Sequence, residues 1–341
     1  MLHKTCRLAG CCSRRVAWKW FIAAMVIALL ALTLWRFDSQ SLLHSLRHIP
    51  LWLMALLLGL QIISQLLVNT LWHSIAKLTN TPISFGKMFK INSQGAVVDA
   101  ITPGVKFGGE VTRGVQIKRV ANCDGTQAAT LVVLQKLFSL TAFFFALLFA
   151  IGTLTRQVPV LQAWATQMLF YGVSLALLLL FLGILLAPQA AQSYIQKRNA
   201  LRFAWARKLR GFVLTLLTQV EAVGKHRMQL TALFGLSLLI WLLYPLKLYL
   251  LVVQFAPDIS IVYIAAIAFV AYMVAMLPIF PGGLGGFEGT MTALLAVFGL
   301  AAGDAAVTTI LFRFVTFWFV MLMGLAVIAV GKAAQHMRRQ R

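Results

Sequence analysis

Long apolar segments separated by short basic ones run along almost the whole chain. Full membrane spans are predicted near residues 18–37, 50–76, 126–153, 164–187, 228–255 and 305–331. An α-helix needs about 20 mostly apolar residues to cross a bilayer, and each of these segments is long enough. Transmembrane β-strands would instead give weak alternating segments of about 10 residues. The pattern therefore predicts an all-α polytopic membrane protein.

Two further apolar regions, 83–120 and 259–300, are each interrupted near the middle by a cluster of proline and glycine. Proline breaks a helix because it lacks an N–H donor, and glycine permits a positive φ. Non-helical backbone is tolerated at membrane depth only when it is buried in protein or lines a wet cavity. In addition to about six full spans, we therefore expect two re-entrant helical hairpins inside the bundle.

Charge gives the orientation of these spans. The net charge of +22 comes from 30 Lys/Arg against 8 Asp/Glu among 341 residues. In a soluble protein this excess would indicate nucleic acid, but here the cations lie in the loops, as the positive-inside rule describes. With a cytoplasmic N-terminus, 24 Lys/Arg lie inside and 3 outside. We therefore predict no nucleic-acid partner, a bacterial inner-membrane location and two cytoplasmic termini.

One transmembrane domain accommodates all the spans. The predicted parts are a basic tail at 1–17, the domain at 18–331 and a second basic tail at 332–341; the domain contains a first repeat at 50–153, an amphipathic cytoplasmic linker at 189–227 and a second repeat at 228–331. Within the linker, 189–210 mixes aromatic and basic residues. It suits a helix at the interface, in contact with anionic lipid head groups, or an extension of a span.

The two interrupted regions share a motif. Residues 103–110 read PGVKFGGE and residues 281–288 read PGGLGGFE, with four identities: Pro103 and Pro281, Gly104 and Gly282, Gly108 and Gly286, and Glu110 and Glu288. The following span carries a cation in each copy, Lys136 in the first and Arg313 in the second. The first hairpin would enter the membrane from the cytoplasmic side and the second from the outer side. This pattern is typical of an inverted repeat with a site where the interrupted helices meet.

The chemistry of these motifs suits transport. A broken helix frees N–H groups that favour an anion such as a lipid phosphate, and Gly282–Gly286 would supply them. Glu110 and Glu288 would pair with a substrate amine, carry a proton or bind a cation. A charged side chain at membrane depth costs about 2.5–3.5 kcal/mol on insertion scales, so it faces a cavity or a partner. In the alternative interpretation, Glu288 and Arg313 only lock helices together, and Glu110 lies at the cytoplasmic surface.

Three further ionisable residues are weaker candidates for substrate binding. Asp99 lies at the tip of the first hairpin, and Arg113 lies in the basic segment after it. Lys247 follows Pro245 inside a span and either snorkels along a kink or coordinates a head group. The six histidines show no metal-ligand spacing, and no nucleophile–base pair or nucleotide-binding loop is visible. We therefore expect no metal, no cofactor and no enzymatic activity.

Two stretches carry a resemblance to a known family. PGGLGGFEGTMTALLAVFGL at 281–300, with LFRFVTFWFVMLMG at 311–324, resembles the signature of the lysylphosphatidylglycerol synthase transmembrane-region family. TPGVKFGGEVTRGVQIKR at 102–119 is similar to its first-repeat motif. The resemblance covers about 15–335. The motif residues that it implies are Pro103, Gly104, Gly108, Glu110, Pro281, Gly282, Gly283, Gly285, Glu288 and Arg313.

The resemblance implies a lipid flippase or scramblase. Its best-known members flip an aminoacylated phospholipid, and others are linked to other phospholipids, polyprenyl-linked glycans or hopanoids. Where many members carry an acidic–Arg pair, this chain has Gln135-Lys136. The chain ends at Arg341, so we expect no aminoacyl-transferase domain. The alternatives are an ion-coupled transporter of a small solute and a non-transporting partner of a lipid synthase; a homo-oligomer is compatible with each.

Overall fold

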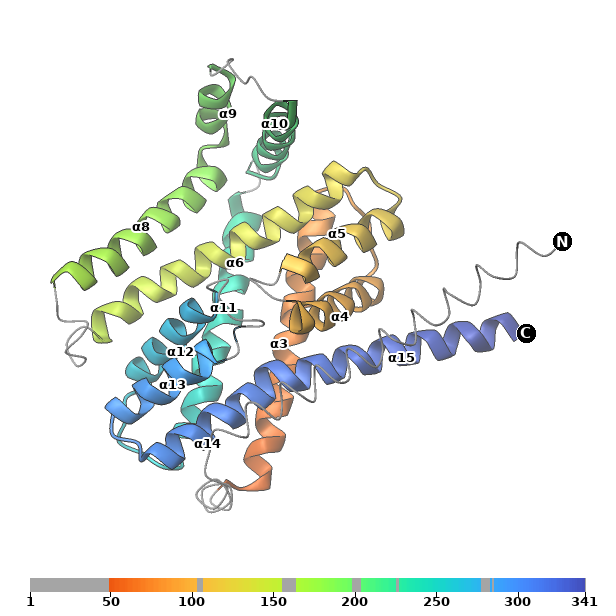
Figure 1. The fold of residues 1–341 in the computed structure, drawn as a ribbon. Coiled ribbons are helices and arrows are strands. Elements are labelled where there is room, and N and C mark those ends of the chain that lie inside the picture. Colours follow the sequence, from red (N-terminus) through yellow and green to blue (C-terminus); the bar gives the residue numbers. More distant parts are fainter. Residues whose placement is uncertain are drawn as a thin grey trace, which may run out of the picture.

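The computed structural model describes residues 49–102, 107–154, 164–197, 204–224, 227–276, 283 and 285–340, and in that part of the chain the protein is all-α (Figure 1). The expected tail at 1–17, the expected span 18–37 and the motif residues Pro103, Gly104, Pro281 and Gly282 lie outside the described residues. The helices are α3 (Leu51–Leu78), α4 (Phe85–Ile101), α5 (Phe107–Ala121), α6 (Gly125–Leu154), α8 (Trp164–Leu186), α9 (Pro188–Lys197), α10 (Ala204–Gly224), α11 (Arg227–Val252), α12 (Ile261–Ala275), α13 (Gly286–Val297), α14 (Ala302–Arg313), the π-helical turn η2 (Phe314–Trp318) and α15 (Phe319–Gln340).

Helices long and apolar enough to cross a membrane occupy the predicted spans. Among the described residues they are α3, α6, α11 and the continuous segment from α14 through η2 into α15. The span predicted at 164–187 is the helix α8, which passes the same test only together with α9; the two helices make an angle of 95°. The protein is therefore a multi-pass membrane protein, as the hydropathy pattern predicted.

Each interrupted region forms a pair of short helices packed against each other. The first pair, α4 and α5, is called hairpin one here, and α12 with α13 is called hairpin two. Their helices have 17, 15, 15 and 12 residues, so at 1.5 Å per residue they are about 18–26 Å long. The hydrocarbon core of a bilayer is about 30 Å thick. No helix of either hairpin is long enough to cross it alone.

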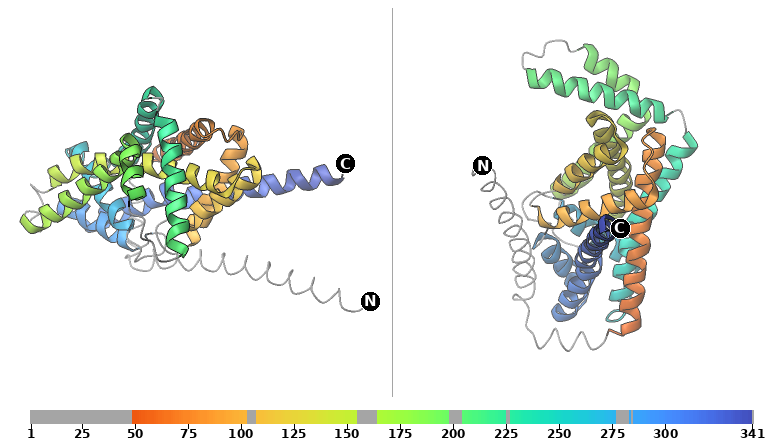
Figure 2. Two further views of the ribbon diagram at one scale, coloured as in Figure 1. Left: turned by 90° about the horizontal axis from the view of Figure 1, so that it is seen from above. Right: turned by 90° about the vertical axis from the view of Figure 1, so that its right-hand side faces the viewer.

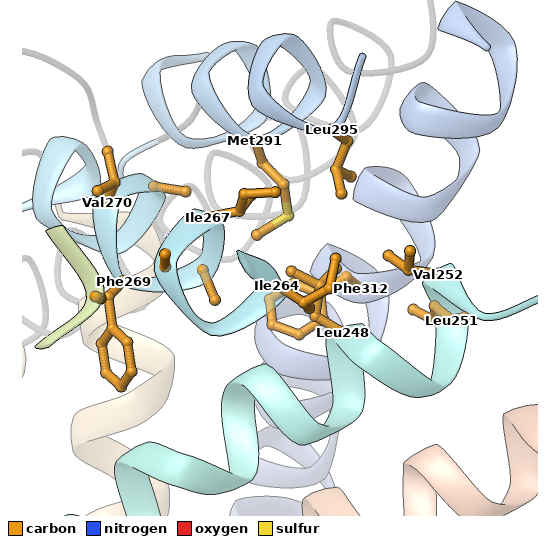
Figure 3. Packing of buried hydrophobic residues seen from close by; sticks show 14 of the residues in the cluster. Leu248, Leu251, Val252, Ile264, Ile267, Phe269, Val270, Met291, Leu295 and Phe312 are labelled. Atoms are coloured by element: carbon orange, nitrogen blue, oxygen red, sulfur yellow. The ribbon is translucent and has the colours of Figure 1, made fainter. Parts of the chain in front are cut away.

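The hairpins lie on different sides of the bundle. Figures 1 and 2 show α6 running through its middle, with α3 and α11 side by side and α15 extending outwards along α4. Hairpin two packs against α6 and α11 in a large apolar core, part of which Figure 3 shows; Ile267, Phe269, Met291 and Phe312 are among its buried residues. Hairpin one joins a second core with α3, α6 and α11. Both hairpins are thus held by the same central spans.

The region of the predicted linker contains the helices α9 and α10. The chain turns sharply after α8, and α9 then packs against α10 in a pair that projects from the bundle (Figures 1 and 2). Glu221 of α10 accepts hydrogen bonds from Gln189 (2.7 Å) and Gln192 (3.1 Å) of α9. The helix α9 therefore does not continue straight on from α8. Pro188 explains the turn, because a proline disfavours helical geometry at the residue before it.

Candidate functional site

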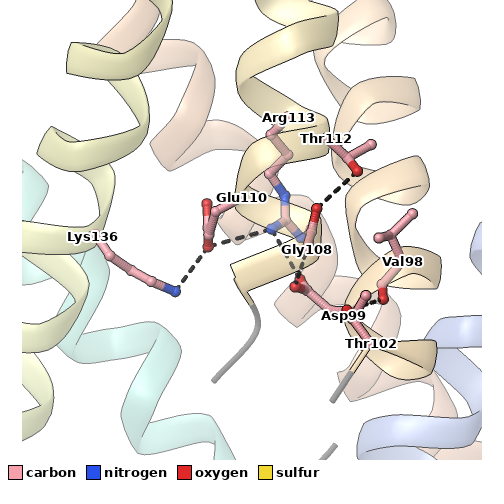
Figure 4. Close-up of polar contacts among 9 residues, drawn as sticks. Val98, Asp99, Thr102, Gly108, Glu110, Thr112, Arg113 and Lys136 are labelled. Atoms are coloured by element: carbon pink, nitrogen blue, oxygen red, sulfur yellow. Dashed lines mark hydrogen bonds and ion pairs between the residues drawn. The ribbon is translucent and has the colours of Figure 1, made fainter. Parts of the chain in front are cut away.

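Hairpin one and α6 together hold a cluster of four charged side chains (Figure 4). Asp99 comes from the last turn of α4, Glu110 and Arg113 from α5, and Lys136 from α6. Arg113 Nη1 lies 3.0 Å from Asp99 Oδ2 and 3.4 Å from Glu110 Oε1. Lys136 Nζ donates to the same Glu110 oxygen at 2.8 Å. We call these four residues the first charge cluster; its two carboxylates balance its two cations.

Glycines make room for the first charge cluster. A Cβ atom at Gly109 would collide with the Asp99 carboxylate, and one at Gly95 would lie 2.5 Å from Arg113 Nε. The Gly109 N–H, at the start of α5, donates to Asp99 Oδ1 at 3.0 Å. An anion at this position is favoured by the helix dipole. Asp99 thus ties the end of α4 to the beginning of α5 across the proline–glycine break.

Hairpin two holds a second ion pair, Glu288 with Arg313. Glu288 lies in the first turn of α13, and its Oε1 accepts from Arg313 Nε at 2.8 Å. The guanidinium lies over the rings of Phe287 (4.7 Å) and Phe317 (4.5 Å). The Glu288 side chain is 10% exposed and the Arg313 side chain 7%. We call these two residues the second charge pair.

The glycine motif shapes the entry to α13. Gly283 and Gly285 have φ values of 72° and 86°, a region that side chains with a Cβ rarely adopt. The Gly285 N–H donates to Glu288 Oε2 at 2.6 Å, so Glu288 caps its own helix. In this structure the Glu288 carboxylate occupies the Gly285 N–H, one of the groups expected to bind a phosphate.

The two hairpins use the same arrangement. In each, a carboxylate in the first turn of the second helix receives a hydrogen bond of 2.8 Å from a cation of the next membrane helix. The pairing of Glu288 with Arg313, predicted as one alternative, is present. Lys136 also has an acidic partner, although Gln135 stands where many family members carry an acidic residue next to the cation. That partner is Glu110, 26 positions earlier. The Glu110 side chain is 14% exposed, so most of it is covered by the protein.

The end of hairpin one contacts the span that carries Arg313. Ala100, next to Asp99, packs with Trp318 and Met321, and Phe317 lies against this small cluster. Phe317 is also one of the two rings beneath Arg313. The π-helical turn that contains Phe317 and Trp318 follows Arg313 directly. Such turns occur frequently at functional sites. The first charge cluster and the second charge pair thus adjoin the same turn.

Lys247 of α11 is fully buried and does not snorkel to an interface. Its Nζ donates to Gln61 Oε1 (2.5 Å) and Ser64 Oγ (3.0 Å) of α3 and lies 4.5 Å from the centre of the Tyr244 ring. Among the described residues, no carboxylate lies within 4.0 Å of it. The snorkelling interpretation is wrong, and Lys247 instead connects two central spans.

Sequence reasoning missed several residues that complete these sites. They are Gly95 and Gly109, which fit against charged side chains, the Phe287 and Phe317 rings, and the α3 partners Gln61 and Ser64. Gln61 and Ser64 were recognisable in the sequence, because isolated polar residues in an apolar span need a partner. Of the remaining predicted residues, Gly108 and Gly286 lie in the first turns of α5 and α13. No group of three metal-ligating side chains occurs within the described ranges.

Comparison with known proteins places the chain in a family. One relative, described as a UPF0104 membrane protein of Methanothermobacter thermautotrophicus, is 25% identical over 270 residues, which are 75% of this chain and 79% of the relative. The family described as the lysylphosphatidylglycerol synthase TM region matches residues 16–324, which include both hairpins and both groups of charged residues. This match covers most of the chain and confirms the resemblance that the two glycine motifs carried. The protein belongs to the lysylphosphatidylglycerol synthase transmembrane-region family.

Proposed function

We propose that the protein moves a phospholipid or another polar-headed lipid between the leaflets of the bacterial inner membrane. The observation that carries the proposal is the matched pair of hairpins, each holding a carboxylate against a cation from the next span. Charged groups at membrane depth are expensive and mark transport pathways more often than plain structure. The family adds a lipid-related membrane context.

In this proposal the head group passes between the hairpins while the acyl chains stay in the bilayer. Each group of charges is balanced internally, so an entering head group exchanges with a partner that is already present. A phosphate that uses the Gly285 N–H must displace the Glu288 carboxylate, which holds it at 2.6 Å. The hairpins act as re-entrant elements of an inverted repeat. The protein itself makes or breaks no covalent bond.

The proposed topology has both termini in the cytoplasm. It rests on the 24 Lys/Arg that this orientation places inside, against 3 outside. The paired helices α9 and α10 then lie on the cytoplasmic side, where Lys197 and Arg207 are exposed. Cations at that surface attract anionic lipid head groups. The proposed protein partners are a second copy of this chain, which would make a homo-oligomer, or a lipid synthase.

Reconstitution tests the proposal. The protein is placed in vesicles of phosphatidylcholine and phosphatidylglycerol that contain a trace of fluorescent phospholipid, and dithionite bleaches the outer leaflet. We expect the protein to speed the loss of the inner-leaflet signal relative to empty vesicles. Glu288→Gln should slow this movement, whereas Asp258→Asn, in the exposed turn after α11, should not. Vesicles that move none of a panel of phospholipid, aminoacylated and polyprenyl-phosphate probes would refute the proposal. Uptake of a water-soluble solute instead would favour the transporter alternative.

A further inference from the structure

The charged side chains at the two hairpins differ in their exposure to solvent. The Lys136 side chain is 35% exposed, whereas those of Arg313 and Glu288 are 7% and 10% exposed. Figure 4 shows Lys136 reaching across from α6 to the beginning of α5, with its ammonium at the edge of the first charge cluster. Arg313, in contrast, lies against two phenylalanine rings. A head group can therefore reach Lys136 without opening the packed interior.

The first charge cluster also contains a replacement partner for Glu110. Arg113 Nη1 lies 3.4 Å from the same Glu110 oxygen that Lys136 binds. Asp99 holds Arg113 at 3.0 Å, and the snug fit against Gly95 leaves the guanidinium little freedom to move. If Lys136 swings away, Glu110 keeps a cation beside it. The second charge pair has no comparable arrangement, because the salt bridges of the described residues give Glu288 only Arg313.

Removing one partner from a buried ion pair is strongly destabilising, since the other charge remains buried. This penalty opposes separation of Glu288 and Arg313 during transport. The same penalty is small when Lys136 leaves Glu110, because Arg113 remains beside that carboxylate. Lysine also suits exchange: its ammonium is a compact charge on a flexible stem, whereas the planar guanidinium stacks on rings.

We infer that Lys136 is the exchanging cation of this protein: it leaves Glu110 and binds the phosphate of the lipid head group, while Arg113 retains Glu110. The inference rests on the proposed function and identifies the group that first takes up the substrate. During this first uptake the second charge pair stays closed and positions hairpin two. The ligand is a lipid phosphate, carried by either a glycerophospholipid or a polyprenyl phosphate.

The experiment compares Lys136→Met, Lys136→Arg and the double variant Glu110→Gln with Lys136→Met in the same vesicles. The probes are fluorescent phosphatidylglycerol, a fluorescent short-chain polyprenyl phosphate and phosphate-free glucosylceramide. Loss of a charge-assisted hydrogen bond predicts about a 10- to 100-fold slower movement of the accepted phosphate probe in Lys136→Met. Lys136→Arg should retain most of the rate. The two phosphate probes show which carrier the protein accepts.

The double variant separates binding from structure. It removes both charges, so no carboxylate is left without its partner, and a merely structural pair would regain its rate. We expect the double variant to stay slow on phosphate probes, with a Tm within about 2 °C of wild type. Recovery of the rate in the double variant, or an unchanged rate in Lys136→Met, would overturn the inference alone. A wild-type protein that moves no probe would refute the proposed function as well.

Discussion

Breaking the Glu288–Arg313 pair from either side should destabilise the fold far more than removing both charges together. Both side chains are at most 10% exposed, so one charge left alone stays buried. Truncating one partner of a buried ion pair costs about 3–5 kcal/mol, whereas replacing both with uncharged groups is often close to neutral. We therefore expect about 3–5 kcal/mol for Glu288→Gln and a similar value for Arg313→Met. The latter also loses two cation–π contacts of about 0.5–2 kcal/mol each.

The assay is a double-mutant cycle in mixed micelles, with unfolding by sodium dodecyl sulfate followed by circular dichroism. The double variant should cost less than either single variant, so the coupling energy should exceed the cost of one single variant, about 3–5 kcal/mol. The same cycle at Glu110 and Lys136 is the matched comparison. Its coupling should be smaller, because Arg113 still holds Glu110 when Lys136 is absent. Additive single effects at Glu288 and Arg313, with a coupling below about 0.5 kcal/mol, would show that this pair contributes nothing to the folded state.

Three further predictions follow from individual contacts. Gly109→Ala should lower stability by about 1–3 kcal/mol, because the new Cβ would collide with Asp99. The control is Gly59→Ala in α3, whose Cβ would meet no atom within 4 Å and which should be neutral or stabilising. Thermal unfolding in detergent compares the two variants. Lys247→Met should cost about 1–3 kcal/mol because Gln61 and Ser64 lose a buried donor, and adding Gln61→Leu should recover part of that loss in the same assay; no recovery would argue against this contact. A single cysteine at Asp258 should react with a membrane-impermeant maleimide from outside intact cells, and labelling from the cytoplasm alone would reverse the topology.

The spans were predictable because their signal is local. The predicted segment 50–76 became α3 (Leu51–Leu78), and 126–153 became α6 (Gly125–Leu154), since a long apolar stretch in lipid must satisfy its backbone as a helix. The breaks between the hairpin helices were also visible in the proline and glycine motifs. The 95° turn after α8 has a local signal in Pro188, because a proline disfavours helical geometry at the residue before it.

The ion pairs were only partly predictable. Glu288 and Arg313 were foreseen as partners because few other charges occur near them in the second repeat. Glu110 lies among several cations, including Lys106, Arg113 and Lys118, and sequence distance alone cannot choose between them. Its contact with Lys136 depends on how hairpin one packs against α6, which is a property of tertiary structure. The fit of Asp99 against Gly109 depends on the same packing and left no pattern in the sequence.

The π-helical turn after Arg313 sets the rotational register of the last span. N-terminal to it, α14 packs on α13 of hairpin two; C-terminal to it, α15 packs on α4 of hairpin one, where Gly324 fits closely against the Ser93 carbonyl oxygen. Each residue of an α-helix rotates the chain by about 100°. Deleting one residue from this turn would leave α14 on hairpin two and turn Gly324 away from Ser93. The contact between the last span and hairpin one therefore depends on the number of residues in the turn as well as on their identity.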